Sequence, residues 1–305
     1  MKPIIPPVEK SALKSELTQD ILLRKTNNAS NELYAFTAHQ CPQLMRELGR
    51  LREMTFRAAG GGTGEEIDLD FYDFCSKPYT QLIVWNPQDQ EIVGGYRYIK
   101  CGDAEVDKNG DYVLATSHLF RFSDNFKNKY LPYTIELGRS FVQPKYQATN
   151  ENRSGLYALD NLWDGLGSLI VNNINIRYFF GKVTMYKSYN SNARNLLLFF
   201  MYKYFPDVEK LVTPINSVFN YNDFIAFDKI FTTGNFNEDF KILQQQIKQF
   251  NEPIPPLINA YMKLTPTMIT FGTSLNDTFG EVEETGILIT INDIFDRKKE
   301  RHIDF

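Results

Sequence analysis

The chain has 305 residues, of which 43% are hydrophobic and 14% aromatic, and this is enough apolar material for a sizeable core. That composition excludes a disordered chain, and a formal net charge of −4 excludes a globally basic surface for non-specific nucleic-acid binding. Its three cysteines, Cys41, Cys75 and Cys101, are too widely spaced for a disulfide framework or a zinc ribbon, which indicates a reducing cytoplasm.

The first 32 residues are expected to form a helical appendage. Leu13, Leu17 and Ile21 recur every fourth residue among charged side chains, which is the pattern of an amphipathic helix. Two interpretations of this apolar stripe stay open, because it can pack against the core or contact a membrane or an acyl chain. Prolines and charges replace the apolar stretch of a signal peptide, and apolar runs are too short to span a bilayer. The sequence therefore favours a protein that is neither exported nor integral to a membrane.

A helix is predicted over residues 42–57, followed by a glycine cluster at residues 60–64. Because glycines free the backbone and five acidic residues follow closely, this segment is predicted to be a mobile, acidic loop. It lacks the GK[ST] ending of a phosphate-binding P-loop, and its carboxylates would repel phosphate. Asp73 and Tyr79 stand where a calcium-binding EF-hand loop needs glycine and glutamate. Neither nucleotide nor calcium binding is therefore indicated.

Strand signals dominate the next part of the chain. Residues 81–86 and 91–100 are rich in β-branched and aromatic residues and flank a short polar turn, which predicts an antiparallel hairpin. Asn109-Gly110 marks another tight turn. A further strand is predicted over residues 133–142, and leucines on one face predict a helix over residues 157–173.

Strands and helices alternate in the second half. A strand over residues 178–186 precedes an apolar helix over residues 193–204, which the Ser191-Asn192 region is expected to cap and Pro206 to end. The last hundred residues are expected to hold a helix at 238–250, a helix after the prolines at 253, 255 and 256, and a strand at 286–291. The pattern predicts a mixed α/β protein.

Several kinds of site lack the residues that they need. None of the three histidines, His39, His118 and His302, stands at a metal-ligand spacing from another histidine or a cysteine, which excludes the common zinc motifs. The sequence contains no GxGxxG segment for a dinucleotide and no GxSxG elbow with a suitable histidine for a hydrolase triad. We therefore expect no metal site.

Charged residues occur where the predicted strands should be buried. Arg97 ends an apolar segment, while Glu136 and Arg139 stand three apart in one strand and so on opposite faces unless a bulge intervenes. Burying such charges unpaired is costly. Two interpretations stay open: an ion-pair network of these residues with Asp70 and Asp73, or a functional polar site built on rigid strands beneath the acidic loop.

Seven segments, in order along the chain, together resemble a known enzyme family. They are Arg52-xxx-Phe56, the glycine-rich loop, Asp70-xx-Asp73, VGGYR (93–97), ELGRSFV (136–142), Leu162-Trp163 and Phe180-Gly181. The series is similar to that of the lipid-forming amino-acid N-acyltransferases, which use ornithine or glycine and an acyl carrier protein. Many of these enzymes carry a hemolysin label, and they are related to the acyl-homoserine-lactone synthases within the GNAT fold. The segment FRAAGGGTG looks closest to the glycine-using branch.

The resemblance implies a fold and a domain organisation. A GNAT-like core would occupy residues 33–206, with a mixed, mostly antiparallel twisted sheet between helices, and a C-terminal extension over 207–305 would complete the same domain. The strands at 133–142 and 178–186 would splay apart and admit the pantetheine arm of the donor between them. RSFVQPKY replaces the Q/RxxGxG/A pyrophosphate loop of acetyltransferases, which favours a carrier-protein donor over coenzyme A.

The resemblance also implies roles for the charged residues. Since an α-amino group has a reference pKa of about 7.7–8.0, its attack on a thioester needs a base, and Glu136 is the first choice, directly or through water. Arg97 and Arg139 are expected either to bind the carboxylate of the amino acid or to fix Asp70 and Asp73. Both alternatives stay open for the two arginines.

Further residues are expected to contact the donor. Phe56 would contact the acyl chain or pack in the core, and Arg52, one helical turn earlier, would lie near the phosphate of the carrier. Backbone N–H groups near Ser140, Phe141 and Val142 would stabilise the tetrahedral oxyanion.

The expected partner is an acyl carrier protein that presents acyl-phosphopantetheine as a substrate, with no permanently bound cofactor. By analogy with GNAT enzymes, Tyr186 or Tyr189 would protonate the leaving thiolate. An acidic carrier needs a basic landing surface. The basic residues nearest in sequence to the predicted donor channel are Arg46, Arg50, Arg57, Lys127, Lys129 and Lys145.

The resemblance therefore implies a cytoplasmic N-acyltransferase that moves a long fatty acyl group, with or without a 3-hydroxyl, to a small amino acid, glycine before others. A peripheral contact with the inner membrane is the open interpretation of the N-terminal stripe. One rival is an acetyl-CoA-dependent acetyltransferase of the same fold, whose acyl pocket would end within two carbons. The other is a membrane-acting protein without enzyme activity, against which the missing export signal and pore strands speak. No nucleic-acid partner is expected.

Overall fold

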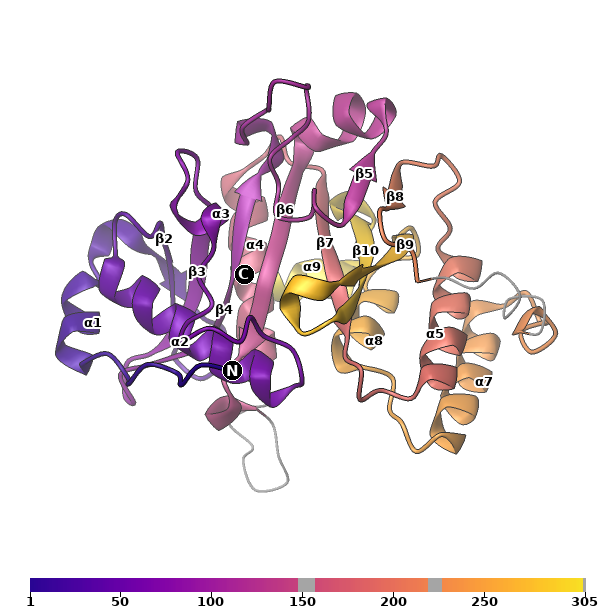
Figure 1. Cartoon of the computed structure of the whole chain (residues 1–305), viewed down its shortest axis with the longest axis horizontal. Coiled ribbons are helices and arrows are strands. Elements are labelled where there is room, and N and C mark those ends of the chain that lie inside the picture. Colours follow the sequence, from indigo (N-terminus) through magenta and orange to yellow (C-terminus); the bar gives the residue numbers. More distant parts are fainter. Residues whose placement is uncertain (148–156, 219–226, 304–305) are drawn as a thin grey trace. The chain divides into compact units, whose positions relative to one another are not determined.

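The computed structural model describes residues 1–147, 157–218 and 227–303 and divides into two compact units (Figure 1). The first unit takes its described residues from Met1–Ala115, Tyr133–Ile176 and Asp296–Phe305. The second unit takes them from Thr116–Pro132 and Arg177–Phe295. Both units thus combine distant parts of the chain, and the boundaries predicted at residues 32 and 206 stay predictions.

Five antiparallel strands form the sheet of the first unit. In spatial order they are β1 (Leu22–Lys25), β2 (Glu32–Phe36), β3 (Thr80–Asn86), β4 (Glu91–Lys100) and β6 (Thr134–Val142). The helices of this unit are α1 (Lys10–Glu16), α2 (Pro42–Ala58), α3 (Phe71–Phe74), α4 (Ala158–Asn172) and α9 (Asp296–His302). The hairpin, the long strand and the two long helices predicted here are confirmed.

Helices cover both faces of this sheet. Side chains alternate along a strand, so Leu82 and its partner Tyr96 project from one face and Gln81 from the other. Gly165 of α4 packs on the first face, where a Cβ would lie 2.7 Å from both Leu82 Cδ2 and Tyr96 Oη. Arg52 of α2 reaches Gln81 on the second face. Both faces of β3 and β4 are therefore buried, which explains their nearly continuous apolar sequences.

The N-terminal helix is shorter than its periodicity predicts. α1 ends at Glu16, and a 3-10 turn (Gln19–Ile21) leads directly into β1. Leu13 and Ile21 keep only 3% and 8% of their exposed surface, so the apolar stripe packs on the unit. Leu17, between them, is partly exposed, and the predicted membrane contact stays a prediction.

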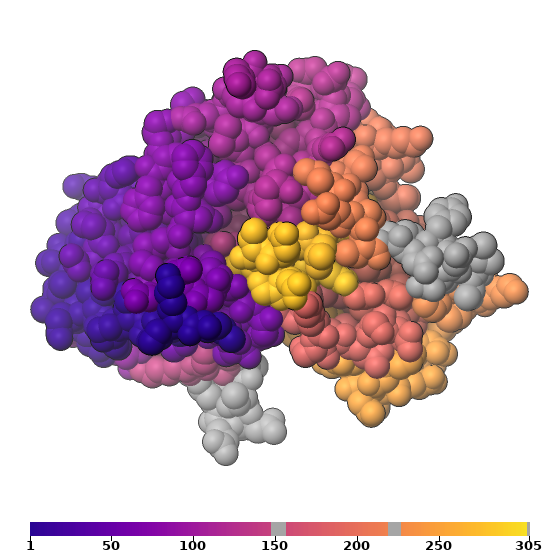
Figure 2. All heavy atoms as spheres, viewed as in Figure 1, coloured from indigo at the N-terminus to yellow at the C-terminus, as the bar shows by residue number. Residues whose placement is uncertain are grey.

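Residues 1–17, which include α1, form an N-terminal strap along α2. Glu16 accepts hydrogen bonds from the backbone N–H groups of Gln43 (2.9 Å) and Leu44 (2.8 Å), which caps α2 from a distant segment. Near the other end of α2, Arg57 donates to the carbonyl of Lys2 at 2.6 Å. In Figure 2 the first residues, in the darkest indigo, lie on the purple surface of the same unit. The N-terminal segment is therefore an integral part of the first unit.

The glycine-rich loop is held by hydrogen bonds, contrary to the predicted mobile segment. The buried Glu53 carboxylate accepts from Thr63 N (3.0 Å), Thr63 Oγ1 (2.8 Å) and Gly64 N (2.8 Å), and it also pairs with Arg57. Lys2 N donates to the carbonyl of Gly64 at 2.8 Å. The sequence shows the glycines but not Glu53 as their distant partner.

The second unit has a three-stranded antiparallel sheet and a separate two-stranded one. The first contains β7 (Tyr178–Met185), β10 (Val282–Thr290) and β9 (Ile269–Asn276), and the second contains β5 (Phe120–Phe122) and β8 (Val212–Pro214). Its helices include α5 (Ser191–Tyr204), α7 (Phe236–Gln249) and α8 (Pro256–Met262). The predicted α/β class with mostly antiparallel strands and flanking helices is confirmed, while β9 was not predicted.

Helix caps show one small correction. Asn190, and not the predicted Ser191-Asn192 region, caps α5, because its side chain accepts from the N–H groups of Asn192 (2.9 Å) and Ala193 (3.2 Å).

Helix α9 was not predicted. It returns to the first unit, where His302 Nδ1 lies 2.8 Å from Asp164 Oδ1 of α4.

Candidate functional site

A row of polar positions crosses the sheet of the first unit on the face of α2. Gln81 of β3 is directly opposite Arg97 of β4, and Arg97 is opposite Gly138 of β6. Gln81 and Arg97 are 0% and 2% exposed, and Arg52 of α2 above them is 0% exposed. Three buried polar side chains in an otherwise apolar layer need partners, and the following contacts supply them.

Arg97 pairs with two aspartates of the segment that was predicted to be a mobile, acidic loop. Its Nη1 and Nη2 donate to Asp70 Oδ1 (2.6 Å) and Oδ2 (2.8 Å), a bidentate pair, and Nη1 also donates to Asp73 Oδ1 (3.1 Å). The rings of Tyr72 and Tyr79 lie 5.6 and 5.0 Å from the guanidinium carbon. Two alternatives were open for Arg97, binding the carboxylate of the amino acid or fixing Asp70 and Asp73. The structure shows Arg97 paired with Asp70 and Asp73.

A β-bulge brings Arg139 to the same group of acids. The register between β4 and β6 shifts between the pairs Gly95–Phe141 and Arg97–Gly138, so β6 has one extra residue between Gly138 and Phe141. Arg139 lies at that bulge with φ of 52°, a left-handed conformation that a non-glycine residue rarely adopts. Its Nε lies 2.8 Å from Asp68 Oδ2, and its Nη2 lies 3.5 Å from Asp70 Oδ2. Glu136 and Arg139 were expected on opposite faces unless a bulge intervened, and the structure has such a bulge at Arg139.

Helix α3 sets the positions of the two aspartates. Asp70 is its N-cap and accepts from Tyr72 N at 3.0 Å, while Asp73 Oδ2 accepts from Asp70 N at 3.1 Å. This reciprocal capping box fixes both carboxylates relative to one backbone turn. The residues that pair with Arg97 therefore also define the local fold.

Arg52 completes the cluster from α2. Its Nη2 donates to Gln81 Oε1, and its Nη1 lies 3.5 Å from Asp73 Oδ1. The predicted contact of Arg52 with a carrier phosphate is wrong for this structure, because its side chain is 0% exposed and turned toward the sheet. Gln81 was missed. A single glutamine in the apolar run QLIVWN, at an inward-facing position, was the signal that could have found it.

Asp70 is the carboxylate of this cluster that solvent reaches. Its side chain is 27% exposed, whereas those of Asp68 and Asp73 are each 1% exposed. Burial raises the pKa of Asp70, but the neighbouring charges of Arg97, Arg139 and Arg52 outweigh it and hold that pKa at about 2. Asp70 is therefore an anion at neutral pH, held on one side by arginine and accessible on the other.

Glu136 lies deeper on the same face. It is opposite Ile99 in β4, two residues from Gly138, and is 1% exposed. Burial and then the charge of Glu136 raise the pKa of both Tyr72 and Tyr79, so this carboxylate is close to their rings. At this depth, proton exchange between Glu136 and a bound amine needs an intermediate such as water.

An aromatic pair borders the charged cluster. The rings of Phe56 and Phe141 meet edge to face, with centroids 6.4 Å apart, and both residues are buried. Ser140, at the bulge, is exposed, and Val142 is opposite Gly94. Phe56 thus packs against the strand predicted to bind the donor.

Tyr186 and Tyr189 belong to the second unit, and their predicted role stays a prediction. Burial and then the charge of Glu284 raise the pKa of Tyr186 to about 12, so its hydroxyl is protonated at neutral pH. The hydroxyl of Tyr189 donates to the carbonyl of Pro253 at 2.9 Å. The predicted gap between strands 133–142 and 178–186 stays a prediction too, because β6 and β7 belong to different units.

Several residues of the expected carrier landing surface are already paired. Arg50 pairs with Glu47 (2.6 Å), Arg57 with Glu53 (2.6 Å) and Lys145 with Glu91 (2.8 Å). Arg46 and Lys129 are exposed, and Lys127 is partly exposed. The paired residues offer less net positive charge to an acidic partner than their sequence suggests.

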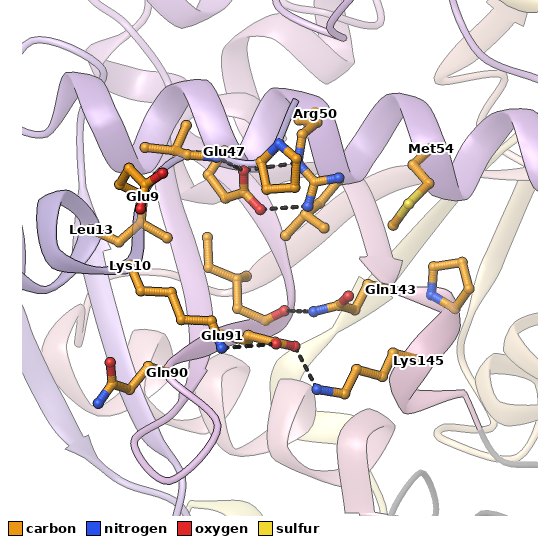
Figure 3. Close-up of a pocket in the computed structure, with 15 residues that line it drawn as sticks. Glu9, Lys10, Leu13, Glu47, Arg50, Met54, Gln90, Glu91, Gln143 and Lys145 are labelled. Atoms are coloured by element: carbon orange, nitrogen blue, oxygen red, sulfur yellow. Dashed lines mark hydrogen bonds and ion pairs between the residues drawn. The ribbon is translucent and has the colours of Figure 1, made fainter. Parts of the chain in front are cut away.

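A cavity of about 680 Å³ lies beneath the N-terminal strap (Figure 3). Its walls come from residues 7–13, one face of α2, the turn between β3 and β4, and the residues after β6. Figure 3 shows Glu91 between Lys10 and Lys145, with the Arg50–Glu47 pair of α2 across the cavity. This cavity has mixed charge, and none of the aspartates of the cluster lines it.

The described residues contain neither a candidate metal-binding group nor a helix that could span a membrane. No three histidine, cysteine, aspartate or glutamate side chains there form a group that could hold a metal ion. None of the described helices combines the length and apolar character needed to cross a membrane.

Comparisons with known proteins give consistent results. A model of the GNAT acetyltransferase domain matches residues 51–153. A glycine N(alpha)-acyltransferase of Phocaeicola vulgatus is 51% identical over 304 residues, which cover 100% of this chain and 93% of the relative. A glycine N(alpha)-acyltransferase of Bacteroides thetaiotaomicron is 53% identical over 303 residues, which cover 99% of this chain and 90% of the relative.

One solved structure also aligns with the chain. It is BjaI, a CoA-dependent acyl-homoserine lactone synthase in complex with SAM and isopentyl-CoA. The TM-score is 0.32 and the sequence identity 13%, over 51% of this chain and 67% of that chain. A similarity this low carries no information on function.

Proposed function

Because the chain belongs to the amino-acid N-acyltransferase family of its two glycine N(alpha)-acyltransferase relatives, we propose that it acylates the amine of glycine. The donor in this proposal is an acyl carrier protein with a long fatty acyl chain, with or without a 3-hydroxyl group. Relatives more than half identical over the full chain support glycine. The replacement of the pyrophosphate loop by RSFVQPKY supports the carrier protein.

The observation that carries the proposal is the partly exposed Asp70 carboxylate. Glycine arrives as an ammonium ion, which a fixed anion binds by charge-assisted hydrogen bonds. Arg97 holds both oxygens of Asp70 from the buried side, so a ligand meets a carboxylate whose orientation is already set. A pKa of about 2 keeps this group charged throughout the physiological range.

The reaction in this proposal is direct attack of the amine on the thioester carbonyl. The ammonium first loses a proton, and Glu136 takes it through a water molecule, because the glutamate is buried. The C–N bond then forms and the C–S bond breaks, with the oxyanion stabilised by backbone N–H groups near Ser140, Phe141 and Val142. As the C–S bond breaks, the nitrogen gives up its second proton, which protonates the leaving thiolate. No covalent enzyme intermediate is involved.

The test uses the purified full chain with 3-hydroxypalmitoyl carrier protein and a panel of amino acids, with amide products detected by mass spectrometry. We expect N-acylglycine as the main product. The same acyl group on coenzyme A is the matched donor, and we expect it to react more slowly. No amide with any amine would contradict the proposed activity, and a preference for the coenzyme A thioester would contradict the donor.

A further inference from the structure

We infer that Gln81 is a positioning residue for binding of the acceptor amine. It holds Asp73, Asp73 holds Arg97, and Arg97 orients the Asp70 carboxylate that would bind the amine. This inference rests on the proposed function. It adds a residue that contacts neither substrate and whose strand, β3, is separated by β4 from β6, the predicted strand of the donor.

The contacts of Gln81 place it between a helix and the capping box. Its Oε1 accepts from Arg52 Nη2, and its Nε2 donates to Asp73 Oδ1 at 3.0 Å and to the carbonyl of Tyr79 at 3.1 Å. The side chain is 0% exposed, so water does not replace these partners. One amide thus uses both of its polar atoms to join α2, β3 and α3.

Arg52 depends on this amide. Its Nε and Nη1 are buried and have no hydrogen-bond partner among the described residues. The hydrogen bond of Nη2 to Gln81 and the 3.5 Å ion pair with Asp73 hold the guanidinium in place. Without the acceptor of Gln81, a buried cation would lose a directional contact, which is expensive in a dry interior.

An uncharged amide can both accept a hydrogen bond from Arg52 and donate one to Asp73. Methionine at this position would fill the space but neither accept from Arg52 nor donate to Asp73. Glutamate would accept from Arg52 but would place a second anion against Asp73. Since Asp73 Oδ1 also accepts from Arg97 Nη1 at 3.1 Å, a displaced Asp73 would move the guanidinium that orients Asp70. The effect is expected on the acceptor side of the reaction.

The experiment measures kcat and KM for glycine and for the acyl-carrier thioester in Gln81→Met, Gln81→Glu and Thr26→Val. Thr26 is the control, because it is a buried polar residue of the same unit whose hydroxyl donates to the carbonyl of Asn28 at 2.7 Å, after β1 and away from the cluster. We expect both Gln81 variants to raise the KM for glycine by about tenfold or more, with the thioester KM within about twofold of wild type. Thr26→Val should leave both KM values near those of wild type.

The outcomes separate this inference from the function on which it rests. A wild-type chain that forms no amide overturns both. An active wild type with an unchanged glycine KM in the Gln81 variants overturns the inference alone. A fall in kcat that Thr26→Val reproduces does so too, because it marks a structural role. If Gln81→Met does not fold, Gln81→Glu decides, since it has nearly the same shape and retains the acceptor for Arg52.

Discussion

Both units bury charged side chains between strands, but the two clusters differ in whether solvent reaches them. In the first unit Asp70, paired with Arg97, keeps 27% of its side-chain exposure. In the second unit Glu284 is 0% exposed, pairs with Lys182 and accepts from Thr184 Oγ1 at 2.7 Å. Buried charge alone therefore does not mark a functional site. An exposed member that the buried members hold in place is the more informative sign.

The comparison is sharpest at Asp70, where we expect the largest effect. Asp70→Asn keeps the shape but removes the charge that would bind the ammonium of glycine, so kcat/KM should fall by about 10²- to 10³-fold. Steady-state kinetics with varied glycine measures this, with circular dichroism to verify folding. A variant within threefold of wild type would remove Asp70 from the acceptor site and end the contrast between the two clusters.

The sealed cluster should respond in stability rather than in acceptor binding. Glu284→Gln removes the fully buried anion that pairs with Lys182, which should lower the free energy of unfolding by about 3 kcal/mol, measured in urea. The control is Glu283→Gln, whose pair with Arg194 is 16% and 25% exposed and should matter less. A large rise in the glycine KM of Glu284→Gln, with stability unchanged, would contradict the distinction.

Acid should weaken the first cluster over a defined range. The pKa of Asp70 is about 2 in the folded chain and about 3.9 in an unfolded one, so the folded state binds its proton less tightly. A depressed pKa gives stability that is present above pH 4 and is lost as the pH falls from 4 to 2, here about 2 kcal/mol. Urea unfolding of wild type and Asp70→Asn at several pH values tests this. The difference between them should shrink below pH 4, and a constant difference would argue against the shifted pKa.

Local sequence patterns predicted most of the long elements of both units. The helix at 42–57 and the strand at 133–142 lie within one or two residues of α2 and β6. The three-residue spacing of Glu136 and Arg139 predicted opposite faces in a regular strand, and only the structure shows that a bulge intervenes. These features depend on periodicity, which a single segment carries in full.

Features that depend on distant partners could not be predicted in the same way. The glycine-rich segment was predicted to be a mobile loop because its hydrogen bonds to the distant Glu53 do not show in the sequence. Arg52 was predicted to lie near a phosphate because its hydrogen bond to Gln81 does not show there either. Likewise, the stripe from Leu13 to Ile21 has helical spacing, although the chain turns after Glu16. Tertiary contacts override local preference at these positions.

The two capped helices provide the smallest test of that difference. α5 takes its cap from the adjacent Asn190, while α2 begins with Pro42 and takes its cap from Glu16, 27 residues before Gln43. Removing either cap by substitution with alanine should cost about 1 kcal/mol of unfolding free energy.

The effects of the two caps should nevertheless differ in kind. Glu16→Ala also detaches the strap from α2, so limited proteolysis should cut residues 1–17 faster in that variant. Asn190→Ala has no such segment to release, and its proteolysis pattern should match wild type. Equal protease resistance of the strap in both variants would show that Leu13 and the Lys2 contacts hold it without Glu16. The remote cap would then be redundant, and the first unit would depend less on distant contacts than its hydrogen bonds indicate.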